Sequence, residues 1–386
     1  MARTPIIWNN EVIDDLHFSW DYIFGYDKTW NFVIGERESG KSVNSWMKIY
    51  NAFYFRNQPS LVIRRQMADI TSVYLGDTEK VLNKFLLPEN QIRLYFLKGD
   101  IEHGVGDVRV GSASEFLSSQ AKIKALPVLF RVAALSTPMS RLKSNVLTDT
   151  AYFFFDEFIA NTIGGEKYLS GDEHFLIQEL YTTYNRESKK RIKIIACGNP
   201  YSIYNPIFSA LGVDSGRLKP GAFISEKDYA IDCFQVPDEL KKLILAKNPM
   251  YQFDETYKRY AFGGEAINDA NIRIHKTEPK GFKLRWVFKI GNDYLSIHQG
   301  SGSFDDEQAS FWICNHKTDW LSKISRNRRI VVFNYTDLIK NAVRFEKKDF
   351  VTFLTLKQAM NTRKVIYNSV DAEYMLTDVL SASNGH

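Results

Sequence analysis

The chain has 386 residues, 44% of them hydrophobic, and carries a net charge of +5. This length predicts two domains of ordinary size, each with its own core. The sequence has no apolar run of 18 residues, which excludes a membrane-spanning helix, and its start lacks the pattern of a signal peptide. The three cysteines, Cys197, Cys233 and Cys314, are far apart. This spacing argues against a disulfide framework or a zinc cluster and favours a reducing compartment.

The basic excess belongs to the C-terminal third of the sequence. Residues 271–386 contain 18 Lys and Arg against 12 Asp and Glu, a charge of +6, whereas the first 270 residues carry −1. This mild asymmetry indicates an anionic partner for the C-terminal third, either nucleic acid or an acidic protein surface. An ordinary solvated surface explains the same charges equally well.

The strongest motif follows the short apolar segment NFVI at 31–34, which we interpret as the end of a buried strand. Eight residues then match the phosphate-loop pattern G-x-x-x-x-G-K-[ST]: Gly35, Glu36, Arg37, Glu38, Ser39, Gly40, Lys41 and Ser42. Glycines let such a loop curl around a phosphate chain, and the helix that follows adds its positive N-terminal end. We expect Lys41 to neutralise the β- and γ-phosphates of ATP and Ser42 to bind Mg²⁺. The strand and helix on either side disfavour the alternative, a structural glycine turn.

Residues 151–158, AYFFFDEF, form the second informative stretch. A strand that is apolar on both faces is fully buried, as in a parallel sheet covered by helices. Two consecutive carboxylates at its end, Asp156 and Glu157, would be costly there without partners. Downstream of a phosphate loop, the partners are Mg²⁺ for Asp156 and the attacking water for Glu157. The pair therefore predicts a metal ligand and a catalytic base for ATP hydrolysis.

Polar side chains also follow two other predicted strands. Arg64 and Arg65 end the strand at 60–66, and Asn199 follows the strand at 192–197. Ligands of open α/β sheets bind beyond the carboxyl ends of strands. The two arginines are thus placed to meet nucleotide or DNA phosphates, and Asn199 to sense the γ-phosphate. The alternatives are a structural ion pair for either arginine and a plain Gly-Asn-Pro turn at Asn199.

The order of these segments predicts an α/β fold. Strands at about 31–35, 60–65, 151–156 and 192–197, with helical segments between several of them, give a mostly parallel sheet with helices on both faces. Residues 91–135 are expected to form an all-β insertion. Lys122 and Lys124 within it are candidates for DNA contact.

The pattern of predicted helices and strands changes further along the chain. We predict an ATPase domain at 1–225, a helical lid or linker at 226–270, and a domain with an antiparallel sheet and helices at 271–386. Two-metal nucleases need clustered carboxylates. The acids available in the last domain are Asp293, Asp305, Asp306 and Asp371. No predicted strand carries an inward-facing acid, and His298 and His316 lack a convincing metal-ligand spacing with Cys314. A non-catalytic binding domain is therefore favoured.

Several motifs together resemble one family. They are NFVIGERESGKS, LVIRRQ, LKSN shortly before FFFDEF, YNRES and GNPYSIYNPIF. The chain resembles the DNA-packaging ATPases, or encapsidation proteins, of phi29-type small tailed phages, which are related to large terminases. The motifs span about residues 30–225, and the resemblance continues colinearly beyond them. It implies a P-loop NTPase domain of the additional-strand, catalytic-glutamate class and a smaller α+β, ribonuclease-H-like C-terminal domain that has lost its nuclease carboxylates.

The resemblance also implies partners and a location. In that family a homopentameric ring assembles on the portal of an empty procapsid in the host cytoplasm, and ATP hydrolysis drives double-stranded DNA inward. The C-terminal domain would then dock on the portal or on a packaging RNA. A terminase with an active nuclease domain and a DNA helicase-type ATPase remain the alternatives, since both use the same loop and acids.

Site residues follow from the same resemblance. Lys143 and Arg186 match basic residues that reach the ATP of a neighbouring subunit. The segment YNRESKKRIK is about two residues longer than the family pattern, so Lys189 and Lys190 remain alternatives to Arg186. Residues 198–200 match the coupling motif of terminases.

Overall fold

The computed structural model describes residues 6–97, 103–144, 146–161, 166, 168–169, 173–200, 205–213, 217–248, 277–291, 293–300, 310–316, 331–334, 354–356, 358–360, 364–369, 372–373, 375–376 and 379–380. The chain forms two compact units. The larger comprises Met1–Ile159, Phe175–Pro200 and Lys219–Glu265, and the smaller comprises Ala160–His174, Tyr201–Leu218 and Ala266–His386. None of the described helices is long and apolar enough to cross a membrane.

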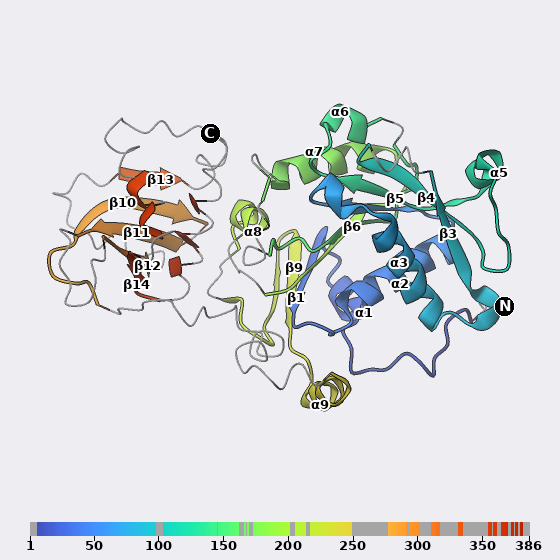
Figure 1. The fold of residues 1–386 in the computed structure, drawn as a ribbon, viewed down its shortest axis with the longest axis horizontal. Helices are drawn as coiled ribbons and strands as arrows, with labels where there is room; N and C mark the ends of the chain where they lie inside the picture. The colour runs from blue at the N-terminus through green and yellow to red at the C-terminus, as the bar shows by residue number, and fades with distance from the viewer. Residues whose placement is uncertain are drawn as a thin grey trace. The chain divides into compact units, whose positions relative to one another are not determined.

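The described residues of the larger unit form a nine-stranded sheet (Figure 1). Its strands lie in the order β3 (Ile92–Phe96), β4 (Val105–Ser112), β5 (Val128–Ala134), β2 (Ser60–Arg64), β6 (Tyr152–Asp156), β7 (Lys193–Gly198), β1 (Trp30–Gly35), β9 (Tyr229–Phe234) and β8 (Phe223–Glu226). Neighbouring strands from β5 to β9 are parallel, and β3, β4 and β8 join through antiparallel pairings. The carboxyl ends of β1, β2, β6 and β7 therefore meet at one edge.

The larger unit also contains helices, and two of them, α2 and α7, pack on the sheet. Their bounds are α1 (Trp20–Phe24), α2 (Lys41–Arg56), α3 (Ser72–Phe85), α5 (Gln120–Ala125), α6 (Met139–Leu142), α7 (Glu173–Arg186) and α9 (Asp238–Lys247), with the short 3-10 turns η1 (Met67–Asp69) and η2 (Pro88–Asn90). Consecutive side chains of β6 point to opposite faces. The rings of Phe154 and Trp46 of α2 are 5.2 Å apart, whereas the rings of Phe153 and Tyr184 of α7 are 5.4 Å apart. These contacts place α2 and α7 on opposite faces of the sheet.

The predicted α/β fold class is confirmed, and β1, β2, β6 and β7 confirm the four strands predicted for its parallel sheet. The prediction that residues 91–135 are all-β was wrong, because Gln120–Ala125 form the helix α5. The strands of this segment extend the same sheet, because β5 pairs in parallel with β2. The prediction of a helical segment from residue 226 was wrong at 229–234, which form β9 beside β1. The run YAIDCF is too short, and too interrupted by Asp232, for its period to be recognised.

The helix α9 does lie in the segment predicted to be helical, and residues 249–276 lie outside the described residues. The domain boundaries at 225 and 270 stay a prediction.

In the described part of the smaller unit, α8 (Pro206–Leu211) accompanies a five-stranded sheet. Its strands lie in the order β13 (Val331–Asn334), β10 (Lys283–Ile290), β11 (Asp293–Gln299), β12 (Phe311–His316) and β14 (Val365–Tyr367). β10, β11 and β12 are antiparallel as predicted. At the two edges of the sheet, β13 pairs in parallel with β10, and β14 pairs in parallel with β12. Asp293 is buried at the start of β11, and Asp305, Asp306 and Asp371 lie outside the described residues.

Polar side chains on β11 and β12 form a buried network in this sheet. Ser296 Oγ lies 2.8 Å from His316 Nε2 and 3.0 Å from His298 Nε2. His298 Nδ1 in turn lies 3.0 Å from Glu278 Oε1. Burial, and then the neighbouring His298, lower the pKa of His316 to about 4. The folded unit therefore favours the neutral form of His316.

Acid is expected to destabilise the smaller unit through His316. In the unfolded chain an imidazole binds a proton near pH 6.5, but in the folded unit His316 does so only near pH 4. Its contribution to stability is present above pH 6.5 and is lost as the pH falls towards 4, by about 1–3 kcal/mol. Urea unfolding of the full chain between pH 7.5 and 4.5, followed by tryptophan fluorescence, measures this loss. A His316→Asn variant should show a shallower pH dependence, and equal slopes in the two proteins would contradict the assignment.

Candidate active site

The phosphate loop joins β1 to α2, and its glycines are required by geometry. Gly40 has φ of 84°, and a Cβ there would lie 2.9 Å from the Cβ of His17. At Gly35, a Cβ would meet the carbonyl oxygen of Phe234 on β9 at 2.8 Å. Only glycine accommodates both the left-handed backbone and the close approach. Because α2 begins directly after Gly40, its first N–H groups border the loop and offer a site for an anion.

Lys41 is 7% exposed and its ammonium lies within the loop. Its Nζ donates to the carbonyl oxygens of Gly35 at 2.8 Å and Glu36 at 2.6 Å, and to Ser39 Oγ at 2.9 Å. Burial lowers the pKa of Lys41 to about 8, although nearby Asp156 opposes the shift. An anionic phosphate beside this ammonium would stabilise its charged form, which is the ligand chemistry that the loop fits.

Ser42 and Asp156 meet at the sheet edge, where Ser42 Oγ donates to Asp156 Oδ1 at 3.1 Å. Burial raises the pKa of Asp156 to about 6, against the opposing effect of Arg64. A buried carboxylate with a raised pKa favours a further cation. A hydroxyl and a carboxylate are oxygen donors that suit Mg²⁺, which completes its shell with phosphate oxygens and water. This donor set fits the predicted metal ion, which Ser42 and Asp156 would hold.

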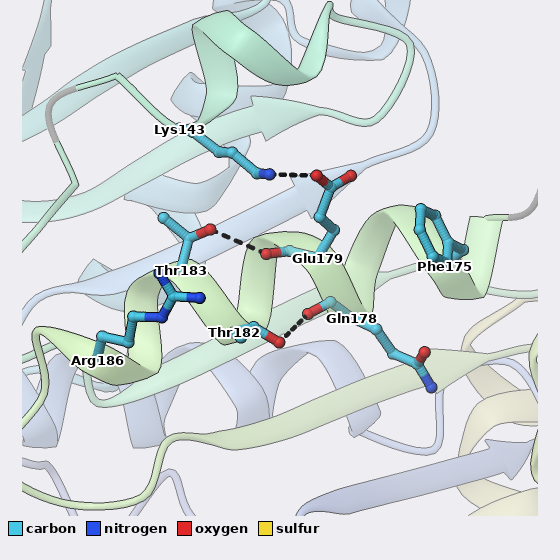
Figure 2. Close-up of a pocket in the computed structure, with 7 residues that line it drawn as sticks. All are labelled: Lys143, Phe175, Gln178, Glu179, Thr182, Thr183 and Arg186. Atoms are coloured by element: carbon cyan, nitrogen blue, oxygen red, sulfur yellow. Dashed lines mark hydrogen bonds and ion pairs between the residues drawn. The ribbon is translucent and has the colours of Figure 1, made fainter.

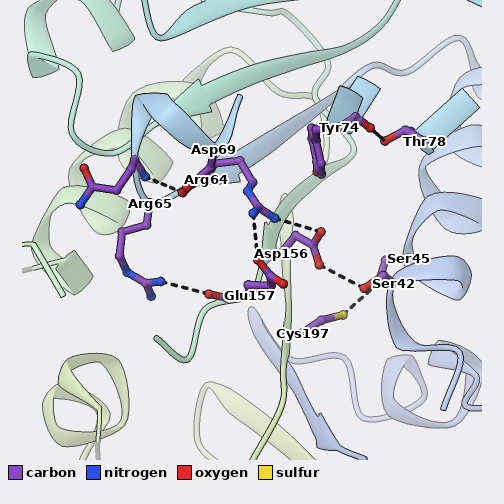
Figure 3. A network of polar contacts seen from close by, with 11 residues as sticks. Ser42, Ser45, Arg64, Arg65, Asp69, Tyr74, Thr78, Asp156, Glu157 and Cys197 are labelled. Carbon is purple, nitrogen blue, oxygen red and sulfur yellow. Dashed lines mark hydrogen bonds and ion pairs between the residues drawn. The ribbon is translucent and has the colours of Figure 1, made fainter. Parts of the chain in front are cut away.

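Arg64, at the end of β2, contacts both carboxylates (Figure 3). Its Nη1 donates to Asp156 Oδ2 at 3.2 Å, and its Nη2 donates to Glu157 Oε2 at 2.8 Å. The guanidinium carbon lies 4.8 Å from the centre of the Tyr74 ring. Although burial opposes it, the carboxylate of Asp156 raises the pKa of Arg64. The ion pair that the sequence left as an alternative is therefore present at Arg64.

Arg65 has a different role from its neighbour. It is buried, and it donates to the backbone carbonyls of Glu157 at 3.2 Å and Phe158 at 2.6 Å. Glu157 has φ of 58°, a conformation that costs a non-glycine residue roughly 1 kcal/mol and is typical of functional sites. Arg65 thus holds the backbone that projects the Glu157 side chain. The contact of Arg64 and Arg65 with phosphates stays a prediction.

Anchors that sequence reasoning missed hold the loop on both sides. Glu36 is fully buried, its Oε2 accepts from the backbone N–H of Val236 at 3.0 Å, and its Oε1 lies 3.4 Å from Lys241 Nζ. On the other side, the N–H of Phe18 donates to the carbonyl oxygen of Ser39 at 2.9 Å. Val236 and Phe18 are ordinary apolar residues far from the motif, so no sequence signal marked them. Glu36 serves to hold the loop in place.

The remaining predicted residues of the site lie around it. Arg37 is partly buried and Glu38 is exposed on the loop. Asn199 follows β7, the strand beside β6, and is partly exposed at the same sheet edge. A Cβ at Gly198 would lie 2.9 Å from the side chains of Phe158 and Ile159, so close packing there requires glycine. Sensing of the γ-phosphate by Asn199 stays a prediction.

Lys143 and Arg186 line a separate pocket of about 380 Å³ on α7 (Figure 2). Its other lining residues are Phe175, Gln178, Glu179, Thr182 and Thr183. Lys143 forms an ion pair with Glu179, whereas Arg186 is exposed and pairs with no acidic residue that the structure describes. The two predicted cations therefore share one surface.

Arg186 lies far from the phosphate loop of its own chain. The backbone N–H of Asp149, which precedes β6, donates to the carbonyl oxygen of Glu187, directly after α7. Asp156 ends the same strand at the opposite edge, and about 3.3 Å per residue makes that separation roughly 20 Å. The two alternatives to Arg186 lie at the same far edge of the sheet. Lys189 pairs with Asp149 at 2.9 Å, and Lys190 is exposed. The structure thus brings Ser42, Arg64, Asp156 and Glu157 together but places Arg186 elsewhere.

No family profile and no curated protein matches the chain. Among solved structures, it is similar to the phi28 gp11 DNA packaging motor, with 18% identity over 97% of this chain and 99% of that chain and a TM-score of 0.56. It is also similar to the bacteriophage phi29 viral genome packaging motor assembly, with 18% identity over 96% of this chain and 100% of that chain and a TM-score of 0.51. This chain therefore has the fold of these packaging-motor proteins. The resemblance that the sequence indicates is confirmed at the level of the fold.

An Arg65→Met variant is expected to lose about 2–4 kcal/mol of stability, because it removes the donor from two backbone carbonyls at a buried position. Urea unfolding of the full chain measures the loss. Arg93→Met is the matched control, since its guanidinium contacts a carbonyl at the surface at 3.4 Å. That control should change stability by no more than about 0.5 kcal/mol. If Arg65→Met instead kept full stability and lost affinity for ATP, the phosphate contact predicted from the sequence would be correct.

Proposed function

We propose that this chain is an ATP-driven motor that moves double-stranded viral DNA into an empty capsid. ATP and Mg²⁺ are its cofactors, and hydrolysis takes place at a subunit interface in a ring. One observation carries the proposal. β6 and α2 bring the hydroxyl of Ser42 within 3.1 Å of Asp156, with Glu157 directly after it. A phosphate loop combined with a metal-binding acid and an adjacent exposed glutamate supports hydrolysis of ATP in addition to its binding.

The chemistry follows from these side chains. The triphosphate binds along residues 35–42 and the first turn of α2, where Lys41 turns from the loop oxygens to the β- and γ-phosphates. Mg²⁺, when bound, neutralises negative charge on the phosphates. Glu157 accepts a proton from the attacking water, the water oxygen bonds to the γ-phosphorus, and the bond to the bridging oxygen of ADP breaks. Because Glu157 is about half exposed, water has access to its carboxylate.

A second subunit completes this chemistry. Arg186 lies at the sheet edge opposite its own phosphate loop and so cannot serve the ATP bound there. Arg186 on α7 and Lys143, directly after α6, line the same open pocket, an arrangement suited to a neighbour's γ-phosphate. A cation supplied in this way is worth on the order of 10³–10⁵ in rate. This geometry supports a ring, with five subunits as in the family that the sequence resembles, and makes hydrolysis depend on assembly.

The cargo and partners are proposed from the fold. The phi28 and phi29 proteins are packaging motors, and their match extends over nearly the full length of both chains. Packaging cannot depend on sequence, so the DNA is gripped through its phosphates. Lys122 and Lys124 on the exposed helix α5 are candidates for this grip. The basic residues of 271–386 dock the ring on the portal of the procapsid or on a packaging RNA, in the host cytoplasm.

Empty capsids that carry a portal are expected to stimulate ATP hydrolysis by this protein about tenfold or more, because docking assembles the ring and supplies the trans cation. A phosphate-release assay with capsids plus DNA, compared with DNA alone, measures the effect. Full stimulation by DNA alone would favour a helicase, which shares the same loop and acids.

The catalytic assignment is checked in the same assay. Glu157→Gln should bind ATP but show no turnover, whereas Glu89→Gln, at an exposed glutamate on η2, should behave as wild type. Normal turnover in the Glu157→Gln variant would contradict the assignment of Glu157 as the catalytic base. DNA cleavage with Mn²⁺ by the wild-type chain would identify a terminase with an active nuclease.

Mixtures of Arg186→Ala and Glu157→Gln subunits should regain part of the ATPase activity that each variant lacks. In such a ring, some interfaces pair an intact Glu157 with an intact Arg186 of the neighbour. Steady-state hydrolysis at several mixing ratios, with capsids present, measures this recovery. The same mixing experiment with Lys190→Ala in place of the Arg186→Ala variant distinguishes the two candidate cations. Recovery of activity in mixtures with Lys190→Ala, but not in mixtures with Arg186→Ala, would assign the trans charge to Lys190.

A further inference from the structure

We propose that the exposed face of α7 docks on a second copy of this chain, where Phe175 packs against Met67 and Val73 beside the acids of the candidate active site. The inference rests on the proposed function, which needs a neighbour at this face, and it names the apolar contact that holds the neighbour there. Phe175 is an anchor for assembly and takes no part in the chemistry.

The exposed side chains of α7 lie along one face of the helix. They are Phe175, Gln178, Thr182 and Arg186, at spacings of three and four residues that put them on the same side. The helix buries its other side. Figure 2 shows Phe175 and Arg186 at the two ends of this face. The face therefore begins with an aromatic ring and ends with a cation.

Phe175 is 53% exposed, although it lines the same pocket as Lys143 and Arg186. Single exposed apolar side chains are ordinary on proteins. An aromatic ring that shares a pocket with an arginine is more specific, because these two kinds of side chain dominate the binding energy of protein interfaces. The pocket volume of about 380 Å³ falls in the range of ligand pockets and exceeds what one phosphate group would fill. The pocket thus has room for apolar side chains of a partner.

A matching apolar surface lies at the active-site edge of the sheet. The segment between β2 and α3 follows Arg64 directly, and within it Met67 is 41% exposed and Val73 is 69% exposed. Val73 precedes Tyr74, whose ring centre lies 4.8 Å from the guanidinium carbon of Arg64. Arg64 in turn contacts both acids of the site. Exposed apolar side chains therefore border the place where the phosphates of ATP would bind.

The dimensions of the two surfaces agree. Phe175 and Arg186 are separated by three turns of α7, which is roughly 16 Å along the helix axis. On the other surface, β2 and β1 lie three strand spacings apart in the sheet, and about 4.8 Å per spacing makes that roughly 14 Å. Met67 and Val73 follow β2, and the phosphate loop follows β1. A neighbour that places Phe175 on the first surface therefore brings Arg186 to the phosphates.

Charge decides which surfaces meet. The α7 face carries Lys143 and Arg186, whereas the site carries two acids and, under the proposed function, a triphosphate. Two α7 faces would repel each other, but an α7 face and the site of a neighbour attract. The contact is therefore head-to-tail, the kind that closes into a ring. DNA is a poorer occupant, because its phosphate backbone offers the ring of Phe175 no apolar partner.

Disulfide trapping tests the contact in the full chain. The three native cysteines are buried, so cysteines introduced at the surface react selectively. Val73→Cys chains are mixed with Phe175→Cys chains on empty capsids that carry a portal, with ATP and Mg²⁺, and are mildly oxidised. We expect at least about tenfold more disulfide-linked dimer than in a control mixture, because the bond requires Cβ atoms roughly 4 Å apart. The control pairs Val73→Cys with Phe116→Cys, at an aromatic residue that is 79% exposed elsewhere.

Assembly gives a second measurement. Phe175→Asp should raise the protein concentration needed for half-maximal capsid-stimulated hydrolysis by about tenfold or more, because a charge replaces the apolar anchor. The Kd of the isolated chain for a fluorescent ATP analogue should change by less than about threefold, since distant sites act independently. Phe116→Asp should leave both values as in the wild type.

Each outcome decides the question. Dimers no more abundant than in the control mixture, with normal half-maximal stimulation in Phe175→Asp, overturn the inference and leave the proposed function standing. Dimers of Phe175→Cys alone, or its disulfides with a capsid protein, would identify another occupant and overturn it too. If Phe175→Cys does not fold, as circular dichroism would show, Gln178→Cys takes its place, and its failure to form dimers with Val73→Cys overturns the inference. Absence of ATP hydrolysis by the wild-type chain overturns the proposed function, whereas the yield of dimer still decides the docking.

Discussion

The structure depends on one electrostatic constraint, a pair of carboxylates at the end of a strand that is buried along its length. All five residues of β6 are buried, and burial raises the pKa of Asp156. An isolated charge on the buried Asp156 would be costly, so it needs partners within reach, whereas Glu157 is about half exposed. The partners come from different elements: Ser42 from α2 and Arg64 from β2. The strand order around β6 therefore brings these partners to the acids. A different order would leave the carboxylates without them.

The loop that faces these acids is held in shape by the protein itself. Glu36 binds the backbone of Val236 on one side, and Ser39 accepts from Phe18 on the other. Lys41 stays inside the loop through its bonds to loop oxygens, and its lowered pKa shows that burial disfavours the ammonium. A bound triphosphate would stabilise the charged ammonium of Lys41, while the backbone of the loop keeps its conformation. A preorganised anion site of this kind binds without first ordering the chain.

Much of this site could be predicted because its chemistry is local. The loop residues are consecutive, and Asp156 and Glu157 follow an apolar run, a weak signal alone that becomes strong downstream of a phosphate loop. The strands of the parallel sheet were predictable for the same reason. What the sequence could not show are contacts between distant segments. Arg64 could face either a phosphate or an acid, and only the parallel pairing of β2 with β6 decides what it contacts. β9 escaped prediction because a strand of six residues with Asp232 in its middle has no clear period.

Under the proposed function, the surface of α7 would explain why a single chain hydrolyses ATP poorly. Arg64 already pairs with both acids, and Lys41 would bind the nucleotide. Under the proposed function, other cations would therefore have to stabilise the transferred phosphoryl group. Lys143 is available for this at little expense, because an ion pair as exposed as that with Glu179 contributes about 0.2–1 kcal/mol. The phosphates of a neighbour's ATP carry several negative charges and would outcompete one carboxylate for it. Arg186 pairs with no acidic residue among the described residues, so it would need no release from such a pair. Under the proposed function, the chain would therefore depend on a neighbour for the charge that completes the transition state, which would couple each hydrolysis to the assembled ring.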